Sequence, residues 1–258
     1  MKTIEIKNLS FKYNRKAPNV LKDINLICEP GSVNVLIGLN GSGKTTLIKI
    51  VAGLLDRYEG EVLIHAKRLR DMSVTERASL ISYVSQKGGI ADDFTVLDYL
   101  LFGKVNSLKF YQSPSPKMEL KVKQTAEKFH IEHLLDKKMG EISGGERQLV
   151  SICCAIVQNS KIIVLDEPTS ALDFKNQAII LSLIRNIARE ENKTILMSSH
   201  NPNQALYLDG KVFLIKDGII IKEGNAKETI TVETLKTVYG ENISYSKDLP
   251  YDEVTFSE

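Results

Sequence analysis

Cysteine is scarce in this sequence, and the few cysteines lack the spacing of a disulfide or metal site. The 258 residues include 3 cysteines, Cys28, Cys153 and Cys154, and no two of them form a C-x-x-C pair. Adjacent cysteines seldom form a relaxed disulfide bond, so we expect all three to be small buried core residues. His130 and His133 are three positions apart on an expected helix, but no third ligand accompanies them, so we expect no metal bound there.

Long apolar runs and an excess of charge of one sign are also missing. No run of about 18 apolar residues could span a bilayer, and the polar start is no secretory signal, so we expect the chain to stay in the cytosol. Lys and Arg number 34 against 32 Asp and Glu, a net charge of +2, which argues against nucleic acid as a partner. Of all residues, 43% are hydrophobic and 26% are charged, which is the composition expected of a soluble globular protein.

What the sequence does contain is an alternation of apolar strands and helical patterns. The polarity alternates as in half-buried strands at 3–9 and 20–28. Apolar runs typical of strands buried on both faces lie at 33–37, 161–165 and 194–198. A helical pattern at 176–191 separates the last two runs, so we expect a largely parallel sheet. A hairpin is expected at 211–223 and a short helix near 231–239.

From about residue 88 to residue 159 the pattern changes to helical segments. Candidate helices cover 96–102, 120–129 and 146–158, and the proline-containing stretch 106–117 is expected to be a loop. We therefore expect a single domain with an inserted helical subdomain. Its parts are an α/β core at 1–87 and 160–241, the helical subdomain at 88–159 and a C-terminal tail at 242–258.

A glycine-rich loop between the strand at 33–37 and a helical pattern has the spacing of the phosphate-binding P-loop. Its residues are Gly38, Leu39, Asn40, Gly41, Ser42, Gly43, Lys44 and Thr45, followed by Thr46. Glycines let successive backbone N–H groups and the helix N-terminus face a phosphate, while Lys44 reaches its oxygens and Thr45 holds Mg²⁺. A chance glycine-rich turn is the alternative, but the strand and the Lys-Thr pair both favour a nucleotide site.

Two acidic residues, Asp166 and Glu167, end the buried strand at 161–165. In a P-loop site Asp166 would bind Mg²⁺ indirectly, and Glu167 would orient or deprotonate the attacking water. Adjacent acids can instead cap the N-terminus of a helix. With a P-loop upstream, we favour the catalytic interpretation.

A second glycine segment, Ser143-Gly144-Gly145-Glu146, precedes a predicted helix and can form an anion site. Read alone, Ser143 and Glu146 could also form an ordinary capping box. With Ile142 in place of the usual leucine, the segment resembles the Leu-Ser-Gly-Gly-Gln signature of ABC ATPases, and the resemblance covers nearly the whole chain. It implies a RecA-like P-loop core with an antiparallel β edge and a homodimer, or a pair with another ABC subunit. Two ATP and Mg²⁺ would each lie between one P-loop and the partner's signature segment.

The resemblance also implies roles for four further residues. Tyr13 would stack on adenine, Gln86 would touch Mg²⁺ and the attacking water, Asp173 lies in a loop that crosses the dimer interface, and His200 would contact the γ-phosphate. Read alone, Tyr13 could be an aromatic packed at a strand edge, and His200 could be a structural histidine.

Further segments resemble the importer ATPases for iron-siderophore, haem and cobalamin uptake, notably those at 75–78, 83–86 and 95–98. This resemblance implies membrane permease subunits and a solute-binding protein as partners, with the chain peripheral at the cytoplasmic face. An exporter motor or a soluble ABC ATPase acting on DNA or ribosomes are the alternatives. Soluble ABC ATPases that act on chromosomes separate the P-loop half from the signature half by a long coiled coil. They are disfavoured because no coiled-coil heptads separate Lys44 from Ser143. ABC ATPases that act on ribosomes usually carry two ATPase modules in one chain. They are also disfavoured, because this sequence contains one.

Overall fold

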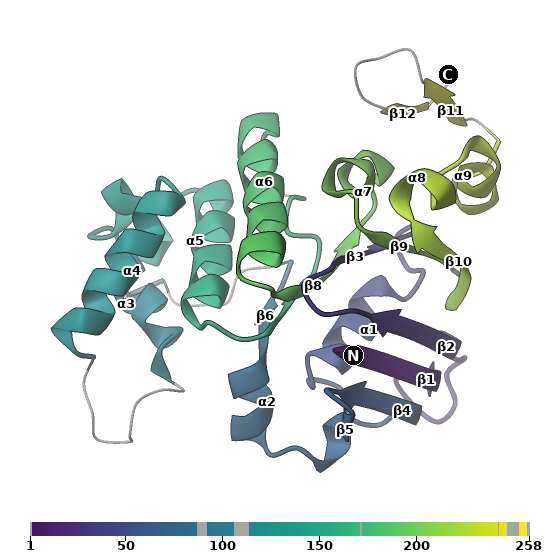
Figure 1. Ribbon diagram of the computed structural model, residues 1–258, viewed down its shortest axis with the longest axis horizontal. Coiled ribbons are helices and arrows are strands. Elements are labelled where there is room, and N and C mark those ends of the chain that lie inside the picture. The colour runs from purple at the N-terminus through teal and green to yellow at the C-terminus, as the bar shows by residue number, and fades with distance from the viewer. Residues whose placement is uncertain are drawn as a thin grey trace.

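The computed structural model describes residues 2–86, 92–105, 114–170, 172–241, 243–246 and 253–256. Its centre is a six-stranded sheet in the order β10-β9-β3-β8-β7-β6 (Figure 1). Five of these strands are parallel, and β10 pairs with β9 as an antiparallel hairpin, which confirms the largely parallel sheet. The bounds are β3 Val33–Ile37, β6 Ile81–Val84, β7 Ile162–Leu165, β8 Thr194–Ser199, β9 Lys211–Lys216 and β10 Ile219–Asn225.

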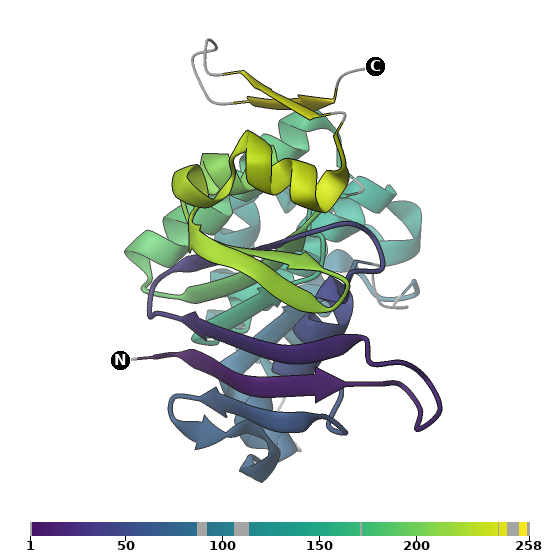
Figure 2. The same cartoon turned by 90° about the vertical axis from the view of Figure 1, so that its right-hand side faces the viewer.

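A second sheet is antiparallel, with the strand order β2-β1-β4-β5, and it forms the predicted antiparallel edge of the fold (Figure 2). Its strands are β1 Ile4–Phe11, β2 Leu21–Cys28, β4 Glu59–Ile64 and β5 Lys67–Arg68. Helix α1 (Lys44–Val51) packs between the two sheets, because Ile48 of α1 shares one buried cluster with Ile4 of β1 and Leu36 of β3. This packing fixes the start of α1 against both sheets.

The opposite face of the six-stranded sheet is covered by helices. Val35 and Ile37 of β3 point to this face and share a buried cluster with residues of α5 and α6. The same cluster extends through Val122 of α4 and Val96 of α3, so the described part of the helical region shares one core with the sheet. The helices of this face are α3 Val96–Phe102, α4 Pro116–Lys128, α5 Gly144–Val157 and α6 Phe174–Glu190, with short 3-10 turns η3 Glu132–Leu134 and η4 Met139–Glu141. The 3-10 turn η1 Leu69–Asp71 and helix α2 Val74–Leu80 connect β5 to β6 and pack on the cluster around α1.

Two expectations for the helical part are wrong. The loop expected to reach residue 117 ends earlier, because Pro116 begins helix α4 and Ser115 caps it. Proline suits the first helical position, where its missing N–H would have no helical partner. His130 lies past the end of α4 with a φ of 56°, and His133 lies in the 3-10 turn η3, so the two do not share a helix. Residues 106–113 and the expected starts of the helical subdomain at 88 and of the tail at 242 lie outside the described residues.

The C-terminal part lies over one end of the parallel sheet, above β9 and β10 (Figure 2). It contains α7 Pro202–Leu208, α8 Ala226–Thr229 and α9 Val232–Tyr239. The tail, for which the sequence indicated no structure, contains an antiparallel pair, β11 Ile243–Ser246 and β12 Glu253–Phe256. These elements place Tyr239, the last residue of α9, close to the loop that follows β8.

The expectation that all three cysteines are buried is confirmed for Cys28 and Cys153 and holds only in part for Cys154. Cys28 and Cys153 are buried and Cys154 is partly buried, and all three are free thiols. Burial raises the pKa of Cys154 to about 11. Among the described residues, no group of three or more His, Cys, Asp or Glu could hold a metal ion. No described helix has both the length and the apolar content that a membrane span requires.

Candidate functional site

The P-loop connects β3 to α1 through glycines in left-handed conformations. Gly43 precedes the first residue of α1 with a φ of 105°, and Gly41 has a φ of 81°. Left-handed backbone is readily adopted only by glycine, and a Cβ at Gly43 would also lie 2.7 Å from Leu21 Cδ2. The loop therefore wraps tightly around the N-terminus of α1, where backbone N–H groups without helical partners can face a phosphate.

Lys44 is buried at the start of α1. Its Nζ donates to the carbonyl oxygens of Gly38, over 2.8 Å, and Leu39, over 3.0 Å, and lies 3.6 Å from Glu167 Oε1. Burial lowers the pKa of Lys44, and the nearby Glu167 carboxylate opposes this shift. The ammonium group thus lies between the P-loop backbone and the carboxylate predicted to act on water.

Asp166 follows β7 and meets two hydroxyl groups. Thr45 Oγ1 donates to Asp166 Oδ1 over 3.0 Å, and Ser198 Oγ donates to the same oxygen over 2.8 Å. Mg²⁺ prefers carboxylate, hydroxyl and water oxygens, so the donor set at Thr45 and Asp166 fits the predicted ion.

Glu167 is the residue on which the other predicted side chains converge. Its Oε2 accepts from Gln86 Nε2 over 3.1 Å and lies 3.3 Å from His200 Nδ1. Its backbone has a φ of 47°, which is uncommon for a residue with a side chain and is the kind of strain found at functional sites. Glu167 is not a helix cap as the alternative interpretation allowed, because the acid that caps α6 is Asp173.

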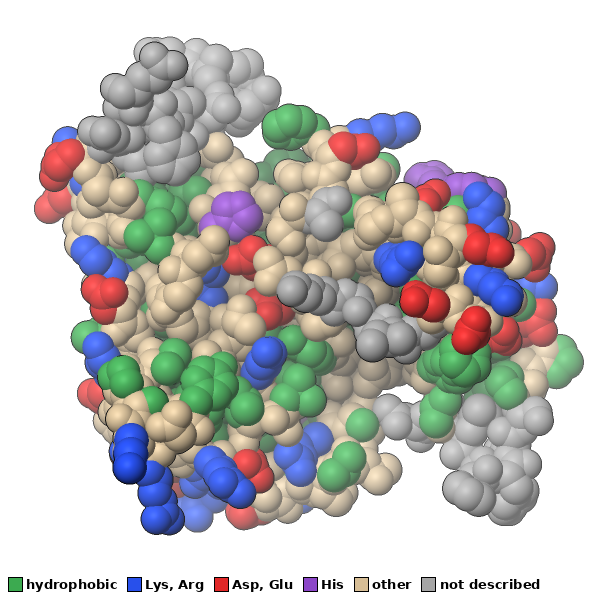
Figure 3. Space-filling model, turned by 180° about the vertical axis from the view of Figure 1, so that it is seen from behind, with side chains coloured by type: hydrophobic (Ala, Val, Ile, Leu, Met, Phe, Trp, Pro, Cys, Tyr) green, Lys and Arg blue, Asp and Glu red, His purple; other side chains and the backbone are tan. Residues whose placement is uncertain are grey.

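A cavity of about 470 Å³ joins the P-loop to the residues beyond β6 and β7. Histidine, acidic and basic side chains gather near the middle of the face shown in Figure 3, on the core side of the helical part. The residues that line the cavity are Tyr13, Val20, Asn40, Gly41, Gly43, Lys44, Thr45, Thr46, Gln86 and Glu167. The structure thus brings together the P-loop, Tyr13, Gln86 and Glu167, which are distant in sequence.

Tyr13 lies at the rim of this cavity, and the residue is 59% exposed. The ring makes an edge contact with Phe11 at a centroid distance of 5.0 Å, so the strand-edge packing considered as an alternative is present. Its hydroxyl also lies 3.0 Å from Thr46 Oγ1 in α1. The contact with α1 holds a half-exposed aromatic ring next to the P-loop, where a base could stack on it.

The signature segment lies elsewhere, at the start of α5. Ser143 Oγ accepts from the Glu146 backbone N–H over 3.2 Å, and the Glu146 carboxylate accepts from the Ser143 N–H over 2.7 Å. This is the capping box that the spacing allowed, and the hydrogen bonds lower the pKa of Glu146. A Cβ at Gly144 would meet no atom within 4 Å, so the helix start faces open space. None of Ser143, Gly144, Gly145 and Glu146 is among the described residues that line the P-loop cavity.

Three residues near the site were missed by sequence reasoning. Ser198 donates to Asp166 and accepts from the Glu167 backbone N–H over 2.9 Å. Gln204 Oε1 accepts hydrogen bonds from Ser199 Oγ over 2.9 Å and from Thr169 Oγ1 over 3.1 Å. The Tyr239 hydroxyl donates a hydrogen bond to the backbone carbonyl oxygen of His200. The hydroxyl of Ser198 directly after the apolar run Ile195–Met197 was the available signal for Ser198, whereas nothing in the sequence pattern distinguished Gln204 or Tyr239.

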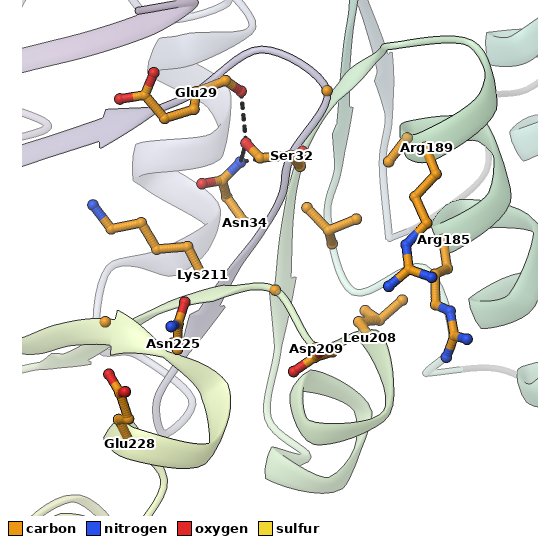
Figure 4. Close-up of a pocket in the computed structure, with 15 residues that line it drawn as sticks. Glu29, Ser32, Asn34, Arg185, Arg189, Leu208, Asp209, Lys211, Asn225 and Glu228 are labelled. Atoms are coloured by element: carbon orange, nitrogen blue, oxygen red, sulfur yellow. Dashed lines mark hydrogen bonds between the residues drawn. The ribbon is translucent and has the colours of Figure 1, made fainter.

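Another hollow, of about 550 Å³, lies at the end of the sheet where strands β3 and β9 begin (Figure 4). Arg185 and Arg189 of α6 stand on one side of it, and Lys211 and Glu228 stand on the other. It contains none of the residues predicted for nucleotide binding, because the P-loop follows the opposite end of β3.

Comparison with known proteins agrees with this geometry. The ABC transporter family profile matches residues 21–170. An uncharacterised ABC transporter ATP-binding protein of Haemophilus influenzae is 35% identical over 92% of this chain and 89% of its own length. A protein of Helicobacter pylori named for iron chelatin transport is 33% identical over 92% of both chains. A molybdate import ATP-binding protein of Haemophilus influenzae is 30% identical over 92% of this chain and 88% of its own.

Two solved structures extend the comparison. One, from an inward-facing transporter described as of the metal-chelate type, has a TM-score of 0.85 and 26% identity, and covers 100% of this chain and 98% of that one. The other is an ATP-binding cassette solved as a dimer in a post-hydrolysis state, bound to ADP and Pi, with a TM-score of 0.74 and 28% identity over 86% of this chain and 98% of its own. With a P-loop ATPase fold and a family match over more than half of its length, this chain belongs to the ATP-binding subunits of ABC transporters.

Proposed function

We propose that this subunit hydrolyses MgATP to drive the import of a metal chelate through a membrane permease. The observation that carries the hydrolytic part is the position of Glu167. This one carboxylate lies 3.6 Å from Lys44 and within hydrogen-bonding reach of Gln86 and His200, next to the P-loop cavity. A carboxylate placed beside the phosphate site can orient water and accept its proton.

The side chains around Glu167 have different roles in phosphoryl transfer. Lys44 and the backbone N–H groups at the start of α1 stabilise negative charge on the phosphates, and Tyr13 stacks on adenine. His200 contacts the γ-phosphate, and Gln86 orients the water together with Glu167. Bound Mg²⁺, held by Thr45 and Gln86 and through water by Asp166, would neutralise part of the phosphate charge.

The signature segment completes the site of a second copy. Ser143, Gly144, Gly145 and Glu146 are absent from the described lining of this chain's own cavity, and the space beside Gly144 at the start of α5 is open. We assign the anion site at α5, and Asp173 at the start of α6, to contacts across a head-to-tail dimer. The dimeric cassette among the similar structures supports this arrangement.

The Helicobacter relative named for iron chelatin transport and the metal-chelate type structure support a chelate as cargo. Such an importer would combine two copies of this subunit, permease subunits and a solute-binding protein, with this chain at the cytoplasmic face. An oxyanion is the second candidate cargo, favoured by the molybdate import relative.

Affinity purification of the tagged subunit from gently solubilised membranes, followed by mass spectrometry, tests the transport assignment. Recovery of a polytopic permease and a solute-binding protein is the expected result, and the recovered binding protein can then be titrated with ferric chelates and with molybdate. Recovery of a membrane partner that exports substrate, or of ribosomes or DNA-repair proteins, would contradict the importer assignment.

The hydrolytic role of Glu167 is tested by Glu167→Gln, which keeps the shape of the side chain and removes its charge. We expect turnover to fall by about two to four orders of magnitude, the usual contribution of a positioned base, while ATP binding is retained. Glu190→Gln is the matched control, because Glu190 is exposed at the end of α6. Turnover at the wild-type rate in Glu167→Gln would contradict the assignment.

A further inference from the structure

A tyrosine from the C-terminal helix α9 reaches the loop that carries His200. The Tyr239 hydroxyl donates a hydrogen bond to the backbone carbonyl oxygen of His200 over 3.0 Å. His200 itself follows β8, and its Nδ1 lies 3.3 Å from Glu167 Oε2. We infer that Tyr239 is a positioning residue that fixes the backbone of His200, and with it the imidazole next to Glu167. The inference rests on the proposed hydrolytic role of His200 and Glu167.

Helix α9 is anchored firmly enough to serve as such a support. Thr231 caps its first turn, and Leu235 and Val238 are buried in the main core. Lys216, at the end of β9, donates through Nζ to the carbonyl oxygen of Thr237 over 2.8 Å. These contacts tie the last turn of α9 to the parallel sheet, so Tyr239 is presented from the same framework that holds β8.

The Tyr239 hydroxyl stays a donor over the range of pH in which the protein would be assayed. Burial raises the pKa of Tyr239, and the negative charge of Glu167 raises it further. The phenol therefore remains protonated, and the carbonyl of His200 can only accept from it.

A role in positioning His200 predicts a larger effect on turnover than on ATP binding, because His200 would contact only the terminal phosphate. The described residues that line the P-loop cavity include Tyr13, Lys44 and Thr45 but neither His200 nor Tyr239. Loss of the Tyr239 hydroxyl would leave the P-loop intact while His200 gains freedom relative to Glu167. Loss of one such hydrogen bond corresponds to a decrease in kcat of about three- to tenfold.

The test is Tyr239→Phe in the full-length chain, because phenylalanine keeps the packed ring and removes only the hydroxyl. Steady-state ATP hydrolysis is measured at a temperature at which circular dichroism shows wild type and variant to be folded. We expect kcat to decrease about three- to tenfold with an unchanged KM, and the assigned ring resonances of His200 to shift in NMR spectra. Tyr207→Phe is the control, because Tyr207 is half-exposed on α7 and its ring faces Arg185.

Unchanged kcat and unchanged His200 resonances in Tyr239→Phe would overturn the inference. A decrease in kcat equal to that of Tyr207→Phe would also overturn it, as would an increase in KM without a change in kcat. Glu167→Gln, assayed in parallel, separates this failure from failure of the proposed function. If Glu167→Gln is inactive while Tyr239→Phe behaves as wild type, only the role of Tyr239 is wrong. If Glu167→Gln hydrolyses ATP normally, the proposed hydrolytic site is wrong.

Discussion

At the scale of single residues, Ser198 links the two acids of the candidate site. Its hydroxyl donates to Asp166 Oδ1 and accepts from the backbone N–H of Glu167. The side chain is fully buried, so water cannot replace either hydrogen bond without rearrangement. Because Glu167 has a left-handed φ, this bond to its N–H helps to hold a strained backbone in place.

Replacement of Ser198 by alanine is expected to damage both stability and activity. It leaves the buried N–H of Glu167 without its partner, so the free energy of unfolding should fall by about 1–3 kcal/mol. Urea denaturation measures this change, and an ATPase assay should show slower turnover because Glu167 is less well fixed. Ser79→Ala is the control, because Ser79 is exposed on α2 and its hydroxyl donates to the carbonyl of Glu76. Equal stability of the two variants would contradict this role of Ser198.

At the scale of elements, the start of α5 has a structural role, the capping box, and a proposed role in anion binding. The capping box of Ser143 and Glu146 satisfies two backbone N–H groups of the helix start, and the space beside Gly144 is open. Capping and anion binding at this helix start are thus compatible, since they use different N–H groups. The two interpretations of the segment can therefore be separated by substitution.

Gly144→Asp tests the anion site without disturbing the cap. An acidic residue in the first turn suits the helix dipole, so the free energy of unfolding should stay the same or rise by about 0.3–1 kcal/mol. Its charge would face the phosphate of the partner's nucleotide, so hydrolysis should be lost while ATP binding to the monomer persists. Ser143→Ala removes the cap instead and should lower the free energy of unfolding by about 1 kcal/mol. Wild-type hydrolysis by Gly144→Asp would contradict the role at the interface.

The elements that the sequence predicts well are those with a local pattern. The strand at 33–37, the glycine loop and the start of α1 are identified by spacing alone, and the structure places them as β3, the P-loop and α1. Strand β4 was not predicted, and its partner β1 lies about 50 positions earlier in the chain. Helix α2 was not predicted because none of its residues is buried, so it has no apolar face to detect. The hairpin β11–β12 was not predicted either, and each of its strands is only 4 residues long. The contacts of Ser198 and Tyr239 depend on the tertiary arrangement, which periodicity does not contain.

At the scale of the whole molecule, the two cores explain how the site is held. One buried cluster packs α1 between the two sheets, and the other joins the opposite face of the parallel sheet to the helices. The ends of β3, β7 and β8 therefore meet with the P-loop, Glu167 and His200 in fixed positions. The start of α5 lies outside this cavity, so the account requires a second copy to complete each site.

The most direct test of this account is the mass of Glu167→Gln in solution with Mg²⁺ and ATP. The variant should bind nucleotide without hydrolysing it, so two copies should remain closed on two ATP molecules. Light scattering coupled to size exclusion should then give twice the mass of one chain with ATP and the mass of one chain without it, and the dimer should contain one ATP per subunit. A variant that stays monomeric at saturating ATP, or that still releases phosphate at the wild-type rate, would contradict the account.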